Sequence, residues 1–147
     1  MGLKRAFVIG LCLAAVAAVV MLAAVIIRPP KIYTSEICPS NSEASKKTAM
    51  QDKNGEPSDW IEIYNPTNKD ISLTGFSLSK NGGGDQPLGG YVIKAHDYII
   101  VYCSSAGFEN ADFPHADFSI GKVSEAEIIL KYDSLQCESI KMPKLNK

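Results

Sequence analysis

From residue 32 onward, short segments in which apolar and polar residues alternate are separated by turn-forming residues. In the segment 59–64, Ile61 and Ile63 alternate with side chains that carry a polar group. Because successive side chains of a strand point to opposite faces, the two isoleucines are predicted to face a core. Comparable patterns predict strands over residues 32–38, 71–73, 75–78, 91–93, 98–103, 118–120, 126–132 and 137–141.

The residues between these segments predict turns and loops rather than helices. Residues 65–66 and 133–134 are predicted tight turns, and residues 94–97 are predicted to join two strands as a hairpin. Segment 98–103 is continuously apolar, which predicts a central strand buried on both faces. This succession indicates an all-β protein in which two sheets pack as a sandwich.

The N-terminal part of the chain has a different pattern. Residues 6–27 are 22 consecutive positions without a charged or strongly polar side chain, and Lys4 and Arg5 precede them. As a helix rising about 1.5 Å per residue, this run is roughly 33 Å long, enough to cross the hydrocarbon core of a bilayer. It predicts an uncleaved transmembrane signal-anchor helix. The alternative is a cleaved signal peptide, whose apolar region is usually shorter.

Charge sets the expected orientation of this segment. With Lys-Arg ahead of the apolar run, we expect the short N-terminus in the cytoplasm and the C-terminal domain outside, in a single-pass protein of the cell membrane. The chain then has five parts. They are the cytoplasmic N-terminus (1–5), the signal-anchor helix (6–27), a juxtamembrane linker (28–31), the β-sandwich domain (32–143) and a C-terminal tail (144–147).

The charge of the domain excludes one class of partner. Beyond Pro30 the chain has 12 basic and 16 acidic residues, a net charge of −4. Proteins that bind nucleic acid by neutralising phosphates need the opposite balance. A nucleic-acid partner is therefore not expected.

Three cysteines follow the anchor, so at most one disulfide can form among them. Cys38 and Cys137 lie near the ends of the first and last predicted strands, which are candidates to be neighbours in the sandwich. Cys103 alternates with Ile99 and Val101. We expect Cys103 to be buried as a small apolar side chain, and the pairing of the three remains open.

Several motifs together resemble one family. The sequence Asp-Trp-Ile-Glu-Ile-Tyr-Asn at 59–65, Leu-Thr-Gly-Phe-Ser-Leu-Ser at 73–79 and His-Ala-Asp-Phe-Ser-Ile at 115–120 resembles the lamin tail domain, in the versions found on bacterial surface and secreted proteins. The resemblance covers about residues 32–143 and implies an immunoglobulin-like β-sandwich without catalytic residues. Animal members bind partner proteins and nucleic acid at the nuclear envelope. Bacterial members accompany membrane anchors, hydrolases or nucleases.

The resemblance departs from the family pattern at the C-terminus. Similar domains often continue past the last strand with an aromatic-containing tail, whereas residues 144–147 contain no aromatic side chain. Either the last sheet edge is short or the sequence is a fragment.

The two histidines do not predict a metal site. His96 and His115 are 19 residues apart, and no third ligand has a suitable spacing. We expect His96 to be a solvated turn residue and His115 to make a structural hydrogen bond near Asp117. No cofactor is expected.

Three further motifs lack the residues that their chemistry requires. Residues 52–56 begin like a calcium loop but lack its later ligands, so we expect a turn. The glycines at 82–84 are not followed by the Gly-Lys-Ser/Thr of a phosphate loop. Ser104 is not part of a Gly-x-Ser-x-Gly elbow. We expect neither an enzyme nor a small-molecule substrate.

The remaining candidate site is a binding surface formed by Trp60, Tyr64 and the polar segment 42–58, a predicted long loop. The alternative for Trp60 is that it packs beneath that loop or at a sheet edge with Tyr64. We therefore expect a membrane-tethered, extracytoplasmic, non-catalytic adaptor with a protein partner at the cell envelope. The alternative function is an accessory module that positions extracellular DNA or glycan for a separately encoded hydrolase.

Overall fold

The computed structural model describes residues 28–39, 41, 50–52, 55–105, 113–121 and 125–143. Nearly all of them belong to the second of two compact units, Lys31–Lys147. The predicted anchor 6–27, the N-terminus 1–5 and the tail 144–147 lie outside the described residues. No helix within the described ranges is long and apolar enough to cross a membrane.

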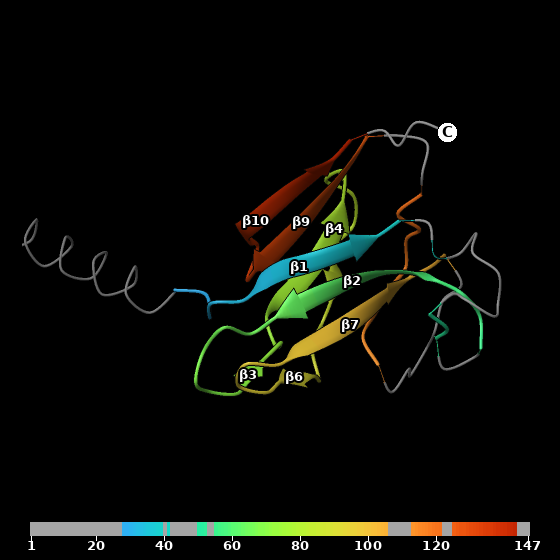
Figure 1. The fold of residues 1–147 in the computed structure, drawn as a ribbon. Coiled ribbons are helices and arrows are strands. Elements are labelled where there is room, and N and C mark those ends of the chain that lie inside the picture. Colours follow the sequence, from blue (N-terminus) through green and yellow to red (C-terminus); the bar gives the residue numbers. More distant parts are fainter. Residues whose placement is uncertain are drawn as a thin grey trace, which may run out of the picture. The chain divides into compact units, whose positions relative to one another are not determined.

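The described part of the domain consists of strands and turns, so the all-β prediction is confirmed (Figure 1). One sheet has the strand order β1-β2-β7-β8, a second has the order β10-β9-β4-β5, and β3 pairs with β6. All pairs are antiparallel except β7 with β8. The strands are β1 (Tyr33–Cys38), β2 (Asp59–Tyr64), β3 (Ile71–Ser72), β4 (Phe76–Lys80), β5 (Gln86–Pro87), β6 (Val92–Ile93), β7 (Tyr98–Cys103), β8 (His115–Ala116), β9 (Ala126–Tyr132) and β10 (Leu135–Met142).

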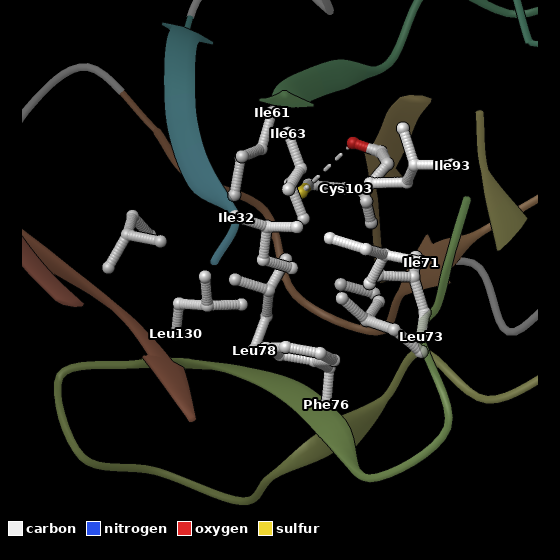
Figure 2. Packing of buried hydrophobic residues seen from close by; sticks show 14 of the residues in the cluster. Ile32, Ile61, Ile63, Ile71, Leu73, Phe76, Leu78, Ile93, Cys103 and Leu130 are labelled. Atoms are coloured by element: carbon white, nitrogen blue, oxygen red, sulfur yellow. Dashed lines mark hydrogen bonds between the residues drawn. The ribbon is translucent and has the colours of Figure 1, made fainter. Parts of the chain in front are cut away.

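The core lies between the inner faces of the two sheets (Figure 2). Ile61 and Ile63 are fully buried, as the alternation in β2 predicts. Leu78 of β4 and Leu130 of β9 face them from the other sheet (Figure 2). Burying one such side chain contributes about 1.5–3 kcal/mol, so this interior is the main source of stability. The cluster contains Ile32, Ile61, Ile63, Ile71, Leu73, Phe76, Leu78, Leu88, Ile93, Val101, Cys103, Ala116, Ile120, Ile128 and Leu130.

Two tight turns follow from local chemistry. Asp133 and Ser134 have φ values of 45° and 69° between β9 and β10, the left-handed pair that suits a two-residue hairpin. Gly75 has φ 86°, and a Cβ there would lie 2.8 Å from Asp133 Oδ1. Only glycine allows the chain to bend here so close to the β9–β10 turn. The turn at residues 133–134 was predicted from the sequence.

The predicted hairpin at residues 94–97 is wrong. β6 pairs with β3 and β7 pairs with β2, so the chain leaves one pair of strands and joins another sheet. A short connection favours pairing of the two strands that it joins. The apolar face of each strand must also reach the core, and in this domain that requirement determines the strand partners.

Other boundaries also differ. The strand expected at 118–120 is replaced by β8, which begins at His115, and β5 was not predicted. β7 is central in its sheet but is not buried on both faces, because Tyr98 is 57% exposed. An antiparallel sheet can face water on one side, and the outer face of β7 is partly open.

The two sheets approach each other at their edges. The N–H of Thr34 in β1 donates to Glu138 Oε2 of β10 over 2.8 Å, so the first and last strands are neighbours. All three described cysteines are nevertheless free. Cys38 lies four residues beyond Thr34, about 13 Å along a strand, whereas Cys137 is adjacent to Glu138. Cys38 and Cys137 are therefore too far apart along the strands to form a disulfide.

Candidate binding face

The strand β2 is held at its first residue by a buried carboxylate. Asp59 is fully buried, and its Oδ2 accepts hydrogen bonds from Ser119 Oγ (3.3 Å), the N–H of Ile120 (3.2 Å) and the N–H of Gly121 (3.1 Å). Because a buried carboxylate is stable only when it is hydrogen-bonded, these donors fix the segment beside the start of β2. The Asp of the motif is therefore structural.

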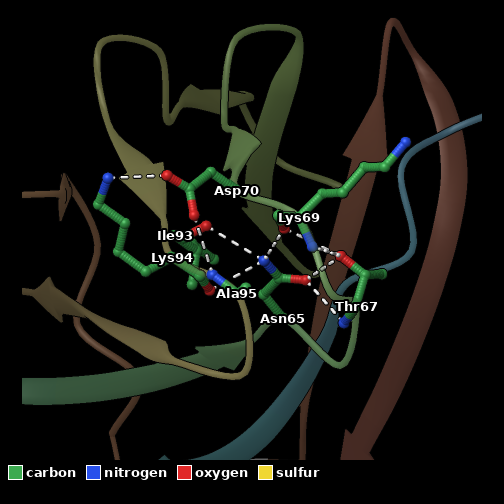
Figure 3. A network of polar contacts seen from close by, with 7 residues as sticks. All are labelled: Asn65, Thr67, Lys69, Asp70, Ile93, Lys94 and Ala95. Atoms are coloured by element: carbon green, nitrogen blue, oxygen red, sulfur yellow. Dashed lines mark hydrogen bonds and ion pairs between the residues drawn. The ribbon is translucent and has the colours of Figure 1, made fainter.

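The other end of β2 is held by Asn65, also fully buried (Figure 3). Its Nδ2 donates to the carbonyls of Lys69 (2.7 Å), Ile93 (3.1 Å) and Lys94 (2.9 Å). Its Oδ1 accepts from the N–H (3.0 Å) and hydroxyl (2.8 Å) of Thr67. One amide thus joins the turn after β2 to the segment that leads into β7, and positions the ends of both strands.

Where β2 and β7 meet at this end, three tyrosines form a row across the first sheet. Tyr64 pairs with Tyr33 of β1 on one side and with Tyr98 of β7 on the other. The rings of Tyr33 and Tyr64 lie edge to face, with centroids 5.6 Å apart. Tyr33 is 40% and Tyr98 57% exposed. The row lies on the outer face, because the neighbouring residue Ile63 points into the core.

The next row on this face is acidic. Glu62 of β2 is the partner of Glu36 in β1, and the register shifts between Thr34 and Glu36. The Ser35 hydroxyl donates to Glu62 Oε1 over 2.6 Å. No ion pair joins either carboxylate to a Lys or Arg in the described part of the chain, and the four strands of this sheet contain no basic residue other than His115. Two like charges therefore lie on partner positions, and neither forms an ion pair within the described residues.

The third row contains Cys38, Trp60 and Tyr102, with His115 beside Tyr102. Trp60 is only 9% exposed, and its Nε1 has no hydrogen-bond partner among the described residues. The Tyr102 hydroxyl donates to the carbonyl of Gln51 over 3.1 Å. Burial and the negative charge of Asp52 raise the pKa of Tyr102.

The burial of Trp60 agrees with the alternative given for this residue, that it packs beneath a loop or at a sheet edge. This indole is covered rather than presented to solvent, so Trp60 offers almost no contact area. Tyr64 belongs to the open end of the face, and Tyr33 and Tyr98 are additional members that the sequence analysis missed. The signal that identifies them is their pairing with Tyr64, which appears only once the strand partners are known.

His115 makes the predicted structural hydrogen bond, with Ser104 as its partner. Its Nε2 lies 3.0 Å from Ser104 Oγ. Burial lowers the pKa of His115, an effect that the negative charges of Asp117 and Asp52 partly oppose. His96 is exposed, as expected for a turn residue, and its Nε2 lies 2.5 Å from Asn68 Oδ1.

Cys103 and Asp52 both have structural roles. Cys103 is 1% exposed, which confirms its expected burial, and that burial raises the pKa of its thiol. Asp52 forms the predicted turn, since its Oδ1 accepts from the N–H of Glu56 (3.1 Å) and its Oδ2 from Ser58 Oγ (3.1 Å). Within the described ranges, no three of His, Cys, Asp and Glu converge as metal ligands would.

The sequence model of the lamin tail domain family matches residues 29–136, well over half of the chain. This chain belongs to the lamin tail domain family. No curated protein matches it significantly. Membership agrees with the all-β sandwich and points to an interaction module of a non-catalytic, immunoglobulin-like family. The match ends inside β10, so residues 137–142 complete a strand beyond the matched range of the lamin tail domain.

Proposed function

We propose that this lamin tail domain is a membrane-tethered, extracytoplasmic adaptor that binds a protein partner at the cell envelope and has no catalytic role of its own. The observation that carries the proposal is the tyrosine row of Tyr33, Tyr64 and Tyr98 on the outer face of the first sheet. Exposed, adjacent aromatic side chains are typical of protein interfaces, where they supply large contact areas at a low cost in conformational entropy.

The apolar segment 6–27 supports the tether. A single-pass anchor confines the domain to the membrane plane and raises its effective concentration toward partners in the same envelope. A face with a modest affinity for its partner is then sufficient. In this proposal the four residues 28–31 join the anchor to the domain.

The alternative function, positioning DNA or glycan for a separately encoded hydrolase, is less well supported. Glu36 and Glu62 lie on the open face beside the tyrosine row, and their charges repel phosphates. Sugars stack on aromatic rings, however, so the tyrosine row is compatible with a glycan. Salt-insensitive binding of the intact protein to an envelope glycan, lost with Tyr98→Ala, would favour this alternative.

Proximity labelling from the intact protein tests the adaptor proposal. We expect a defined set of envelope proteins to be enriched, and the Tyr64→Ala and Tyr98→Ala variants to lose most of that labelling. Leu135→Ala is the matched control, because Leu135 is a 50% exposed apolar residue on the other sheet. Labelling that is unchanged in the tyrosine variants, or lost equally in the control, would disprove the role of this face.

The tether is tested by the mass of the mature protein isolated from membranes. An uncleaved anchor retains residues 1–27, whereas a signal peptide is lost. A mature protein that lacks residues 6–27 and is released into the medium would contradict the tether without affecting the proposed binding face.

A further inference from the structure

We infer that the open face of the first sheet binds a segment of partner polypeptide that carries Arg or Lys, with one cationic side chain seated against Glu36 and Glu62 and beside the tyrosine row. This inference rests on the proposed function, because it names the chemistry of the partner that the face would take.

The acidic pair is unfavourable in the free domain. Glu36 and Glu62 are direct partners across β1 and β2, and like charges in such a pair are destabilising. Ser35 donates to Glu62, but a hydroxyl does not neutralise a carboxylate. A cation placed between the two carboxylates would remove their repulsion and gain charge-assisted hydrogen bonds. The free face is thus complementary to a positive charge.

The neighbouring row supplies a second attraction for the same cation. Tyr64 follows Glu62 by two positions on the same face of β2, a separation of about 7 Å. A guanidinium or ammonium group bound by Glu62 therefore lies near the ring of Tyr64, where the negative face of the ring attracts it. Tyr33 and Tyr98 extend this aromatic surface to both sides for the rest of the bound segment. An arginine fits best, because its planar group pairs with carboxylates and stacks on aromatic rings.

The outer face of the second sheet differs from the first, because it carries opposite charges at neighbouring positions. Glu127 of β9 is the partner of Lys141 in β10, and Lys131 forms an ion pair with Asp85 at 2.6 Å. Glu127 also accepts a hydrogen bond from Ser139 Oγ over 2.5 Å, as Glu62 does from Ser35. Glu127 is therefore a matched control: it has the same type of hydroxyl partner but already has an opposite charge across the strand.

The test uses the full chain in nanodiscs of zwitterionic lipid and a fluorescent peptide of alternating arginine and serine, followed by anisotropy. We expect saturable binding that weakens as salt rises. Glu36→Gln and Glu62→Gln are each expected to raise the Kd about fivefold, and Tyr64→Leu about threefold. Glu127→Gln should leave the Kd unchanged, and thermal unfolding of every variant shows that the fold is retained.

Three results would overturn the inference. The first is no binding of the arginine peptide, or equal binding to the Glu36→Gln/Glu62→Gln double variant. The second is equal binding of a peptide in which glutamate replaces arginine. The third is protection of the backbone amides of β1 and β2 from hydrogen exchange in nanodiscs of anionic lipid without peptide binding, which would make the membrane the occupant. If proximity labelling depends on Tyr98 but not on the carboxylates, the inference fails and the adaptor proposal stands.

Discussion

The outer faces of the two sheets differ in how their charges are arranged. On the second sheet Glu127 lies opposite Lys141, and Lys131 pairs with Asp85. On the first sheet Glu36 lies opposite Glu62, and exposed tyrosines flank the pair. A face whose charges are neutralised within the domain gains little from a partner. The first face has unbalanced charge and open aromatic surface, which makes it the one to test for binding.

The largest expected effect comes from removing the support of the first face at its tyrosine end. Asn65→Asp replaces an amide that donates to three carbonyls by a carboxylate that cannot donate. We expect a loss of about 3 kcal/mol in the free energy of unfolding, measured with urea. Asn68→Asp, at an exposed turn position, is the control and should change it by less than about 0.5 kcal/mol. Equal effects at the two sites would refute a structural role for the Asn65 network.

The opposite end of β2 should be the next most sensitive. Asp59→Asn weakens the hydrogen bonds from Ser119, Ile120 and Gly121, because a neutral acceptor replaces a carboxylate. We expect a loss of about 2 kcal/mol by urea unfolding. Asp97→Asn is the control, since Asp97 is exposed and its side chain accepts from the N–H of Tyr98. A loss at Asp59 no greater than at Asp97 would argue against the buried clamp.

Exchanging the charge patterns of the two faces sharpens the comparison directly. Glu36→Lys creates an opposite-charge pair with Glu62 and should stabilise the free domain by about 0.5 kcal/mol. Lys141→Glu creates a like-charge pair with Glu127 and should destabilise it by about the same amount. Both values are measured by urea unfolding at low salt. Changes of the same sign in the two variants would show that cross-strand charge does not distinguish the faces.

The smallest expected effect concerns pH and His115, at the covered end of the first face. Because its pKa is lowered in the folded state, the unfolded chain takes up the proton first as pH falls below about 6.5. The stability that neutral His115 contributes is therefore complete above that pH and is lost as the pH falls below it. Between about pH 7.5 and 5.5, the Tm of His115→Gln should fall about 2 °C less than that of the unsubstituted protein. Identical pH profiles would mean that His115 is not held neutral.

Much of the fold was predictable because it follows from local periodicity. The alternation around Ile61 and Ile63 identified β2 and its buried face, and Cys103 was expected in the core. Residues 133–134 predicted their hairpin because aspartate and serine favour turns, and both adopt left-handed conformations there. The partners of β6 and β7 were not predictable in this way. Pairing depends on which arrangement buries the most apolar surface, and this is not visible in any single segment.

The candidate site, like the fold, was predictable from the sequence only in part. Alternation alone placed Trp60 and Tyr64 on the outer face of β2, but it did not decide which of the two side chains is covered. The tertiary structure covers Trp60 and leaves Tyr64 between two other tyrosines that are 31 residues before it and 34 residues after it in the chain. Glu36 likewise faces Glu62 only because a register shift in β1 brings them together.

The sequence by itself determined the all-β class, the buried side of β2 and the family, because strand periodicity and turn chemistry are local properties of the chain. Only the tertiary structure decided which outer residues stay open and which charges meet. Exposure and charge pairing depend on segments far apart in sequence, whose positions are set when the two sheets bury their apolar faces against each other.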